Sequence, residues 1–128
     1  MIISAPVSLG ELIDKISILL IKKEKIVDQT KNNHISHELN KLQETLNISS
    51  IDKSKIDPLI QELKDINLKL WKVEDEIRIC EKEKDFKEKF INLARSVYKY
   101  NDVRASIKLK INNDFGSSLV EIKSYENY

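Results

Sequence analysis

The sequence predicts an all-α fold: a four-helix bundle built on a long antiparallel helical hairpin, with extended segments at both ends. Apolar residues from Leu59 to Cys80 recur in alternating steps of four and three, which places them along one stripe of an α-helix. The same rhythm returns from Phe86 to Ile111, after a charged segment. The chain also holds only two glycines and two prolines, which leaves little turn chemistry for a many-stranded sheet.

The composition limits the classes of partner. A chain of 128 residues is long enough for one domain with a buried core. The 22 Lys and Arg residues nearly balance the 21 Asp and Glu residues, so there is no strong field to attract nucleic acid or an anionic membrane, and we expect neither as a partner. No apolar run is long enough to span a bilayer. The single cysteine, Cys80, lies on the apolar stripe, so we expect a buried thiol, no disulfide and a cytoplasmic location.

Capping patterns mark where the helices should begin. Ser8 and Glu11 form the pattern of a capping box, and apolar residues on more than one face of the following helix predict that it lies at the centre of the bundle. Asp57 before Pro58 marks a further helix start, and Asp85 offers a cap for the last helix. The expected elements are an extended arm over 1–7, helices over 8–28, 33–47, 57–81 and 85–112, and a tail over 115–128.

Two residues do not fit a plain apolar bundle. Arg104 falls on the apolar stripe of the last helix, where its guanidinium needs a carboxylate or a phosphate unless it reaches the solvent. Both a structural ion pair and ligand binding remain open. Trp71 lies beside the main stripe and shares its helix face with Asp75 and Arg78. It could pack against the first helix or a second protomer, or form one wall of a polar pocket.

The hairpin geometry predicts which polar residues meet. If the chain reverses near residue 85, positions whose numbers sum to about 170 lie at the same level. Arg95 would then lie level with Asp75, and Tyr98 with Lys72. Candidate residues for a ligand site or a structural polar cluster are Glu11, Asp14, Lys15, Trp71, Glu74, Asp75, Arg78, Arg95, Tyr98, Asn101, Asp102 and Arg104.

Glu11 and Asp14 form a carboxylate pair three residues apart on the first helix. Such a pair resembles half of the site in the all-helical nucleotide pyrophosphohydrolases, where pairs on adjacent helices hold magnesium against substrate phosphates. The matching half is missing here. His34 and His37 have no further metal ligand nearby in the sequence. We therefore expect no bound metal and no cofactor.

Four sequence blocks stand out along the chain: SLGELIDKISILLIK, LWKVEDEIR, LARSVYKYNDVRASIKLKIN and GSSLVEIKSY. Together they resemble a family of small, all-helical bacterial and phage-associated proteins of unknown function. The resemblance extends over nearly the whole chain. Because the family has no established activity, it implies no catalytic residue.

Two functions remain open. The first is an interaction or assembly module. We expect it to be a homodimer, because the short second helix cannot bury all the apolar surface of Trp71 and the first helix. It could also bind an unidentified protein partner. The alternative is a small-ligand or phosphate-handling enzyme, similar to a metal-dependent nucleotide pyrophosphohydrolase, with a polar site between the first, third and fourth helices. The first predicts that the charges pair with one another, and the second predicts that they converge on an open cleft.

Overall fold

The computed structural model describes residues 1–128 and contains four helices and no strand. In chain order the helices are α1 (Leu9–Lys25), α2 (Gln29–Ile48), α3 (Lys53–Glu83) and α4 (Glu88–Asp114). They pack against one another, so the predicted all-α four-helix bundle is confirmed. None of the helices combines the length and the apolar character needed to cross a membrane.

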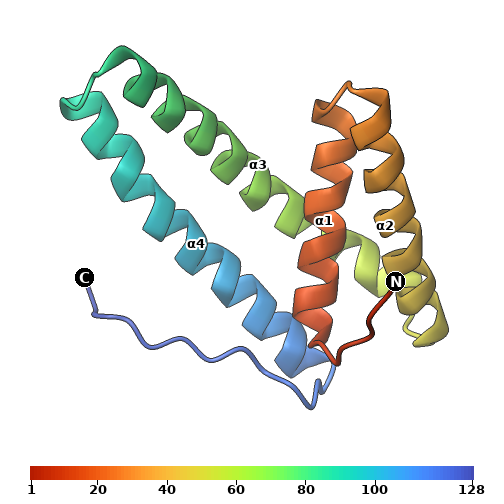
Figure 1. The fold of residues 1–128 in the computed structure, drawn as a ribbon. Coiled ribbons are helices and arrows are strands. Elements are labelled where there is room, and N and C mark those ends of the chain that lie inside the picture. Colours follow the sequence, from red (N-terminus) through yellow and green to blue (C-terminus); the bar gives the residue numbers. More distant parts are fainter.

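α1 is the central helix of the bundle. α3 and α4 form a long hairpin, and α1 lies across the half of the hairpin that is remote from its bend, with α2 beside it (Figure 1). α1 approaches all three other helices, whereas the backbone of α2 approaches α1 alone. The half of the hairpin that contains the bend therefore extends beyond α1 and α2 (Figure 1).

Two apolar clusters fix α1 in this position. One joins α1 to α2 through Leu12, Ile16, Leu19, Ile35 and Leu39. The other joins α1 to the hairpin through Ile13, Ile56, Leu63, Ile66 and Ile111. Full burial of one such side chain contributes about 1.5–3 kcal/mol. α1 supplies residues to both clusters, which explains why its sequence is apolar on more than one face.

The hairpin reverses direction after Lys84, as the sequence predicts. Lys84 ends α3 in the left-handed conformation, with φ of 56°. Its N–H donates to the carbonyl of Glu81 at 3.2 Å, and the N–H of Asp85 donates to the carbonyl of Cys80 at 2.9 Å. These bonds satisfy carbonyls that the end of the helix would leave unpaired. Cys80 itself is a buried free thiol on α3.

α2 begins four residues earlier than the sequence pattern indicates. Residues 29–32, which lie outside the expected helix over 33–47, form the first turn of α2. The reason is the cap: the side chain of Asp28 accepts a hydrogen bond from the N–H of Lys31 at 2.9 Å. An aspartate at this position satisfies a free N–H of the first turn and favours an early helix start.

α3 and α4 also begin at residues other than those predicted. Asp52, not Asp57, caps α3, and its side chain accepts from the N–H of Ser54 at 2.9 Å. Pro58 therefore lies inside the helix, where its missing N–H leaves the carbonyl of Ser54 without its helical partner. α4 begins at Glu88 after Lys87, which makes no side-chain cap. Asp85 instead accepts from the N–H of Lys87 at 3.1 Å and stabilises the bend.

The start of α1 crosses the end of α4 at unusually short range. The side chain of Ser8 caps α1 by accepting from the N–H of Glu11 at 3.2 Å. The N–H of Gly10 donates to Oδ1 of Asn112 at 2.7 Å. A Cβ atom on Gly10 would lie 2.6 Å from the carbonyl oxygen of Lys108, so only glycine allows this approach. The crossing brings the first turns of α1 against the polar face of α4.

Candidate functional site

A buried ion pair lies where α1, α3 and α4 meet. The carboxylate of Asp14 on α1 is only 1% exposed. It accepts hydrogen bonds from Nε of Arg104 at 3.0 Å and from Nη2 of the same guanidinium. Nδ2 of Asn67 on α3 also donates to Asp14, at 2.9 Å. The buried charge is thus both paired and hydrogen-bonded, as a stable buried carboxylate requires.

Ser17 completes the contact between α1 and α3. Its hydroxyl donates to the carbonyl of Asp14 at 2.7 Å and accepts from Nδ2 of Asn67 at 2.9 Å. Ser17 and Asn67 are both buried. Together with Asp14 and Arg104 they form the central polar network, which links three helices.

Lys108 extends this network towards the surface. Its ammonium lies 2.6 Å from Oε2 of Glu11, 2.7 Å from Oε2 of Glu121 and 4.0 Å from Oδ2 of Asp14. Burial of Lys108 disfavours its charge, but hydrogen bonds to Glu11 and Glu121 outweigh this effect and hold its pKa above the usual value. The hydrogen bond to Asp14, partly opposed by burial, likewise raises the pKa of Arg104. Both cations therefore remain charged at neutral pH.

An open cleft adjoins the central polar network. It has a volume of about 600 Å³ and lies between α1, α3 and α4. Asn67 and Arg104 belong both to the network and to the cleft, and Ile18 and Ile21 of α1 form an apolar part of its wall. The remaining lining residues are Leu70, Trp71, Glu74, Asp75, Arg78 and Asn101.

The structure places the candidate residues from the sequence in several environments. Those that line the cleft are Trp71, Glu74, Asp75, Arg78, Asn101 and Arg104. Glu11 and Asp14 bind the cations of α4, and exposed Lys15 lies 3.8 Å from Glu11. Arg95 is exposed, forms no salt bridge with Asp75 and does not line the cleft.

Tyr98 and Asp102 lie instead beneath the tail. The tail, residues 115–128, runs back along α4 without regular secondary structure (Figure 1). The hydroxyl of Tyr128 donates to Oδ2 of Asp102. Its ring makes an edge-on contact with Tyr98, with 5.0 Å between the ring centroids. Glu121 adds a further contact of the tail, an ion pair with Lys108.

Sequence reasoning missed Ser17, Asn67, Lys108 and Glu121 of the network, and it missed Asn112, which accepts from the N–H of Gly10. One signal was available, because Arg104, Lys108 and Asn112 recur every four residues and so form a polar stripe on α4. The Nδ2 atom of Asn112 is buried without a hydrogen-bond partner. No comparable signal shows that Glu121 of the tail reaches Lys108.

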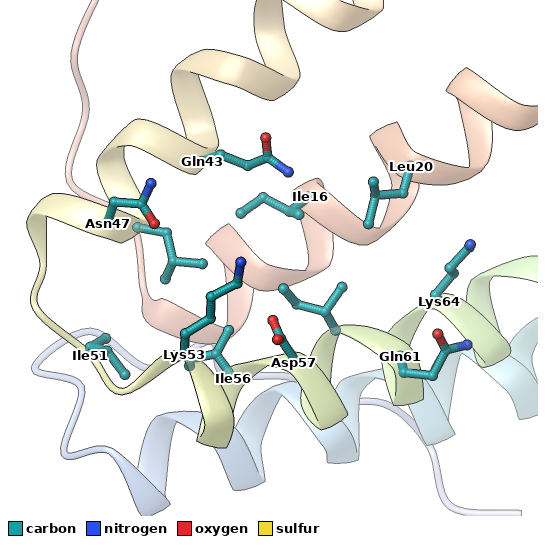
Figure 2. A pocket seen from close by; sticks show the side chains of 12 residues that line it. Ile16, Leu20, Gln43, Asn47, Ile51, Lys53, Ile56, Asp57, Gln61 and Lys64 are labelled. Carbon is teal, nitrogen blue, oxygen red and sulfur yellow. The ribbon is translucent and has the colours of Figure 1, made fainter.

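A second cavity lies between α1, α2 and the start of α3. Its volume is about 430 Å³. Lys53 and Asp57 point towards it from α3, and Gln43 approaches from α2 (Figure 2). Ile16 and other core residues form its apolar wall. It contains no member of the central polar network and no candidate residue from the sequence, so the cleft is the candidate site.

The network explains the roles of Glu11 and Asp14. No group of three or more metal-ligating side chains comes together in the structure. Glu11 and Asp14 instead neutralise Lys108 and Arg104, which lie at hydrogen-bonding distance. Glu11 does not close a full capping box, since its side chain binds Lys108. The arrangement favours a fixed polar site over a carboxylate cage for a cation.

Residues 3–128 match a protein family described as "Family of unknown function (DUF6165)". The chain belongs to this family. Membership of the DUF6165 family agrees with the resemblance found in the sequence blocks and assigns no activity to the cleft. No curated protein and no solved structure matches the chain.

Replacement of Asp14 by alanine tests the central polar network. We expect the Asp14→Ala variant to lose about 3–5 kcal/mol of unfolding free energy, because it leaves the guanidinium of Arg104 without its carboxylate partner and removes one of the two acceptors of Asn67. Urea denaturation measures the loss. Asp65→Ala is the matched control, because Asp65 is exposed and bonds only Gln61, and it should change the free energy by at most about 0.5 kcal/mol. Similar effects of the two substitutions would contradict the network.

The pH dependence of tail docking tests the contact between Glu121 and Lys108. The hydrogen bond from Lys108 holds the pKa of Glu121 below its usual value. The contact therefore stabilises the docked tail fully above the usual glutamate pKa of about 4.3, and this stabilisation is lost as the pH falls through the lowered pKa. We expect NMR spectra of the tail amides to stay constant from about pH 7 to 5 and to show mobility in stronger acid. Release of the tail between pH 7 and 5 would contradict the contact.

Proposed function

We propose that this protein binds a small polar ligand in the cleft between α1, α3 and α4. The observation that carries the proposal is the placement of Arg104. Asp14 engages its Nε and Nη2 atoms, yet the side chain is 28% exposed and lines the cleft. A guanidinium has five N–H donors, so several remain available to a ligand.

The support of Arg104 favours binding. Its position is fixed by Asp14, whose carboxylate also accepts a hydrogen bond from Asn67. A polar group that is fixed before a ligand arrives loses little entropy on binding. The buried part of the network thus has a role beyond joining helices, because it presents a charged group at the inner end of an open cleft.

The other lining residues indicate the chemistry of the ligand. Trp71 is half-buried in the cleft wall and offers an aromatic surface. Glu74 and Asp75 bring negative charge near the mouth, and Arg78 forms an exposed pair with Glu74 at 3.4 Å. Because Asp14 already neutralises Arg104, the cleft has no strong excess of positive charge. This favours a ring-bearing ligand with several hydrogen-bonding groups over a bare phosphate.

Fluorescence of Trp71, the only tryptophan, can test the proposal directly. We expect a member of a panel of sugars, nucleosides and amino acids to change its emission and to raise the melting temperature. The Arg78→Ala substitution should lower the affinity for that ligand roughly tenfold, as expected for the loss of one charge-assisted contact. Arg95→Ala is the control, because this exposed arginine lies on the same hairpin but outside the cleft. Equal weakening by the two variants, or a panel without response, would count against the site.

Self-association is a second candidate function, supported by the exposed apolar residues near the bend. Ile79, Phe86 and Ile91 are each about half exposed, at 48%, 48% and 52%. They belong to the half of the hairpin that α1 and α2 leave uncovered (Figure 1). A second copy related by a twofold axis would bring the same residues from both chains together and remove their apolar surface from water.

Light scattering tests this second candidate. We expect a dimer that becomes a monomer when Ile79 and Ile91 are both replaced by glutamate, because charge at the centre of an apolar contact is costly. Val27→Glu is the control, because Val27 is 95% exposed and lies in the connection between α1 and α2. A monomeric wild-type protein at micromolar concentration would overturn the candidate.

A further inference from the structure

The contact between Glu121 and Lys108 joins two very different parts of the molecule. Lys108 belongs to α4, and its side chain is only 7% exposed. Glu121 belongs to the tail, which has no regular secondary structure and whose residues from Ser118 onwards are all exposed. An exposed segment thus inserts one carboxylate against a buried cation.

The surroundings of this carboxylate are rich in cations. A recess of about 130 Å³ adjoins it and is lined by Asn101, Arg104, Ala105, Lys108, Glu121 and Lys123. Lys123 lies 3.7 Å from Oε1 of Glu121. Apart from Glu121, the lining contains three cations and an amide but no acidic side chain; Arg104 and Lys108 belong to α4, whereas Lys123 belongs to the tail, as Glu121 does. Glu121 is therefore the only anion that the recess itself contains.

The rest of the network does not depend on Glu121. Glu11 lies 2.6 Å from Lys108, and Asp14 pairs with Arg104, and neither contact involves a residue of the tail. These two carboxylates belong to α1, which two apolar clusters fix in place. Departure of the tail would remove both Glu121 and Lys123 and would leave Lys108, Arg104 and Asn101 on α4, with the places of Lys108 and Arg104 still set by Glu11 and Asp14.

We infer that this recess is an anion-binding site that Glu121 fills from within, and that a carboxylate or phosphate group of an external ligand replaces Glu121 and releases the tail. The recess has the two properties such a site needs: a desolvated ammonium fixed by its neighbours, and an occupant attached to a weakly held segment. It shares Asn101 and Arg104 with the cleft, but the inference stands without the ligand proposed there, because a bare anion can test it.

The test compares Glu121→Ala with Glu126→Ala. Both substitutions remove one negative charge from the tail, so non-specific attraction of anions is equal in the two variants. Glu126 makes no salt bridge. We expect inorganic phosphate or acetate, measured by calorimetry at constant ionic strength, to bind Glu121→Ala roughly five- to tenfold more tightly than Glu126→Ala, since the internal competitor is gone. If Glu121→Ala binds only phosphate more tightly, the site recognises phosphate groups. If it also binds acetate more tightly, the site recognises carboxylates as well.

A second measurement on the wild-type protein tests the exchange itself. Saturating anion should make the backbone amides of residues 118–128 mobile by NMR relaxation, while the amides of α4 remain ordered. Equal affinities of the two variants for both anions would overturn the inference. A tail that stays docked when the anion is bound would also overturn it.

Discussion

The buried pair of Asp14 and Arg104 is the constraint on which the arrangement of α1, α3 and α4 depends. Removing a carboxylate from water costs several kcal/mol even in a relaxed protein. The cost is offset only if a cationic partner lies in correct geometry and the remaining acceptor positions of the carboxylate receive hydrogen bonds. Here Arg104 is the partner, and Asn67 donates a further hydrogen bond. A shift of α1 by one residue would separate these groups, so the pair selects one register among those that apolar packing alone would allow.

The position of the cleft follows from the lengths of the helices. α1 has 17 residues and α3 has 31, which correspond to about 26 and 46 Å at 1.5 Å per residue. α1 therefore covers only part of the hairpin, and the cleft lies where this cover ends, with Trp71 on the uncovered side. The same mismatch in length leaves Ile79 and Ile91 exposed near the bend. The open cleft and the exposed apolar residues thus have one structural cause.

The sequence predicted the hairpin because the apolar stripes of α3 and α4 carry a strong helical period on both sides of a charged bend. It was less successful at helix starts, since Asp28, Asp52, Asp57 and Asp85 all resemble caps and only tertiary packing decides which of them act. Site residues were predictable where a polar residue interrupts an apolar stripe, as at Arg104. Partners on other helices were not predictable. Periodicity indicates on which face of its helix a residue lies, but not which residue of a neighbouring helix it contacts. Asp14, Asn67 and Arg104 are brought together only by the fold.

The energetics of the tail differ from those of the bundle. Ordering a residue costs about 1–2 kcal/mol in backbone entropy, whereas partly exposed ion pairs such as that of Glu121 contribute at most about 1 kcal/mol each. Beyond Ser117, whose N–H donates to the carbonyl of Asn112, the contacts of the docked tail with α4 include the ion pair of Glu121, the hydrogen bond of Tyr128 to Asp102 and its ring contact with Tyr98. The tail is therefore held far more weakly than the bundle, which has its apolar clusters and its buried pair. Replacement of Glu121 by an external anion would remove one contact of the tail and would leave the contacts within the bundle unchanged.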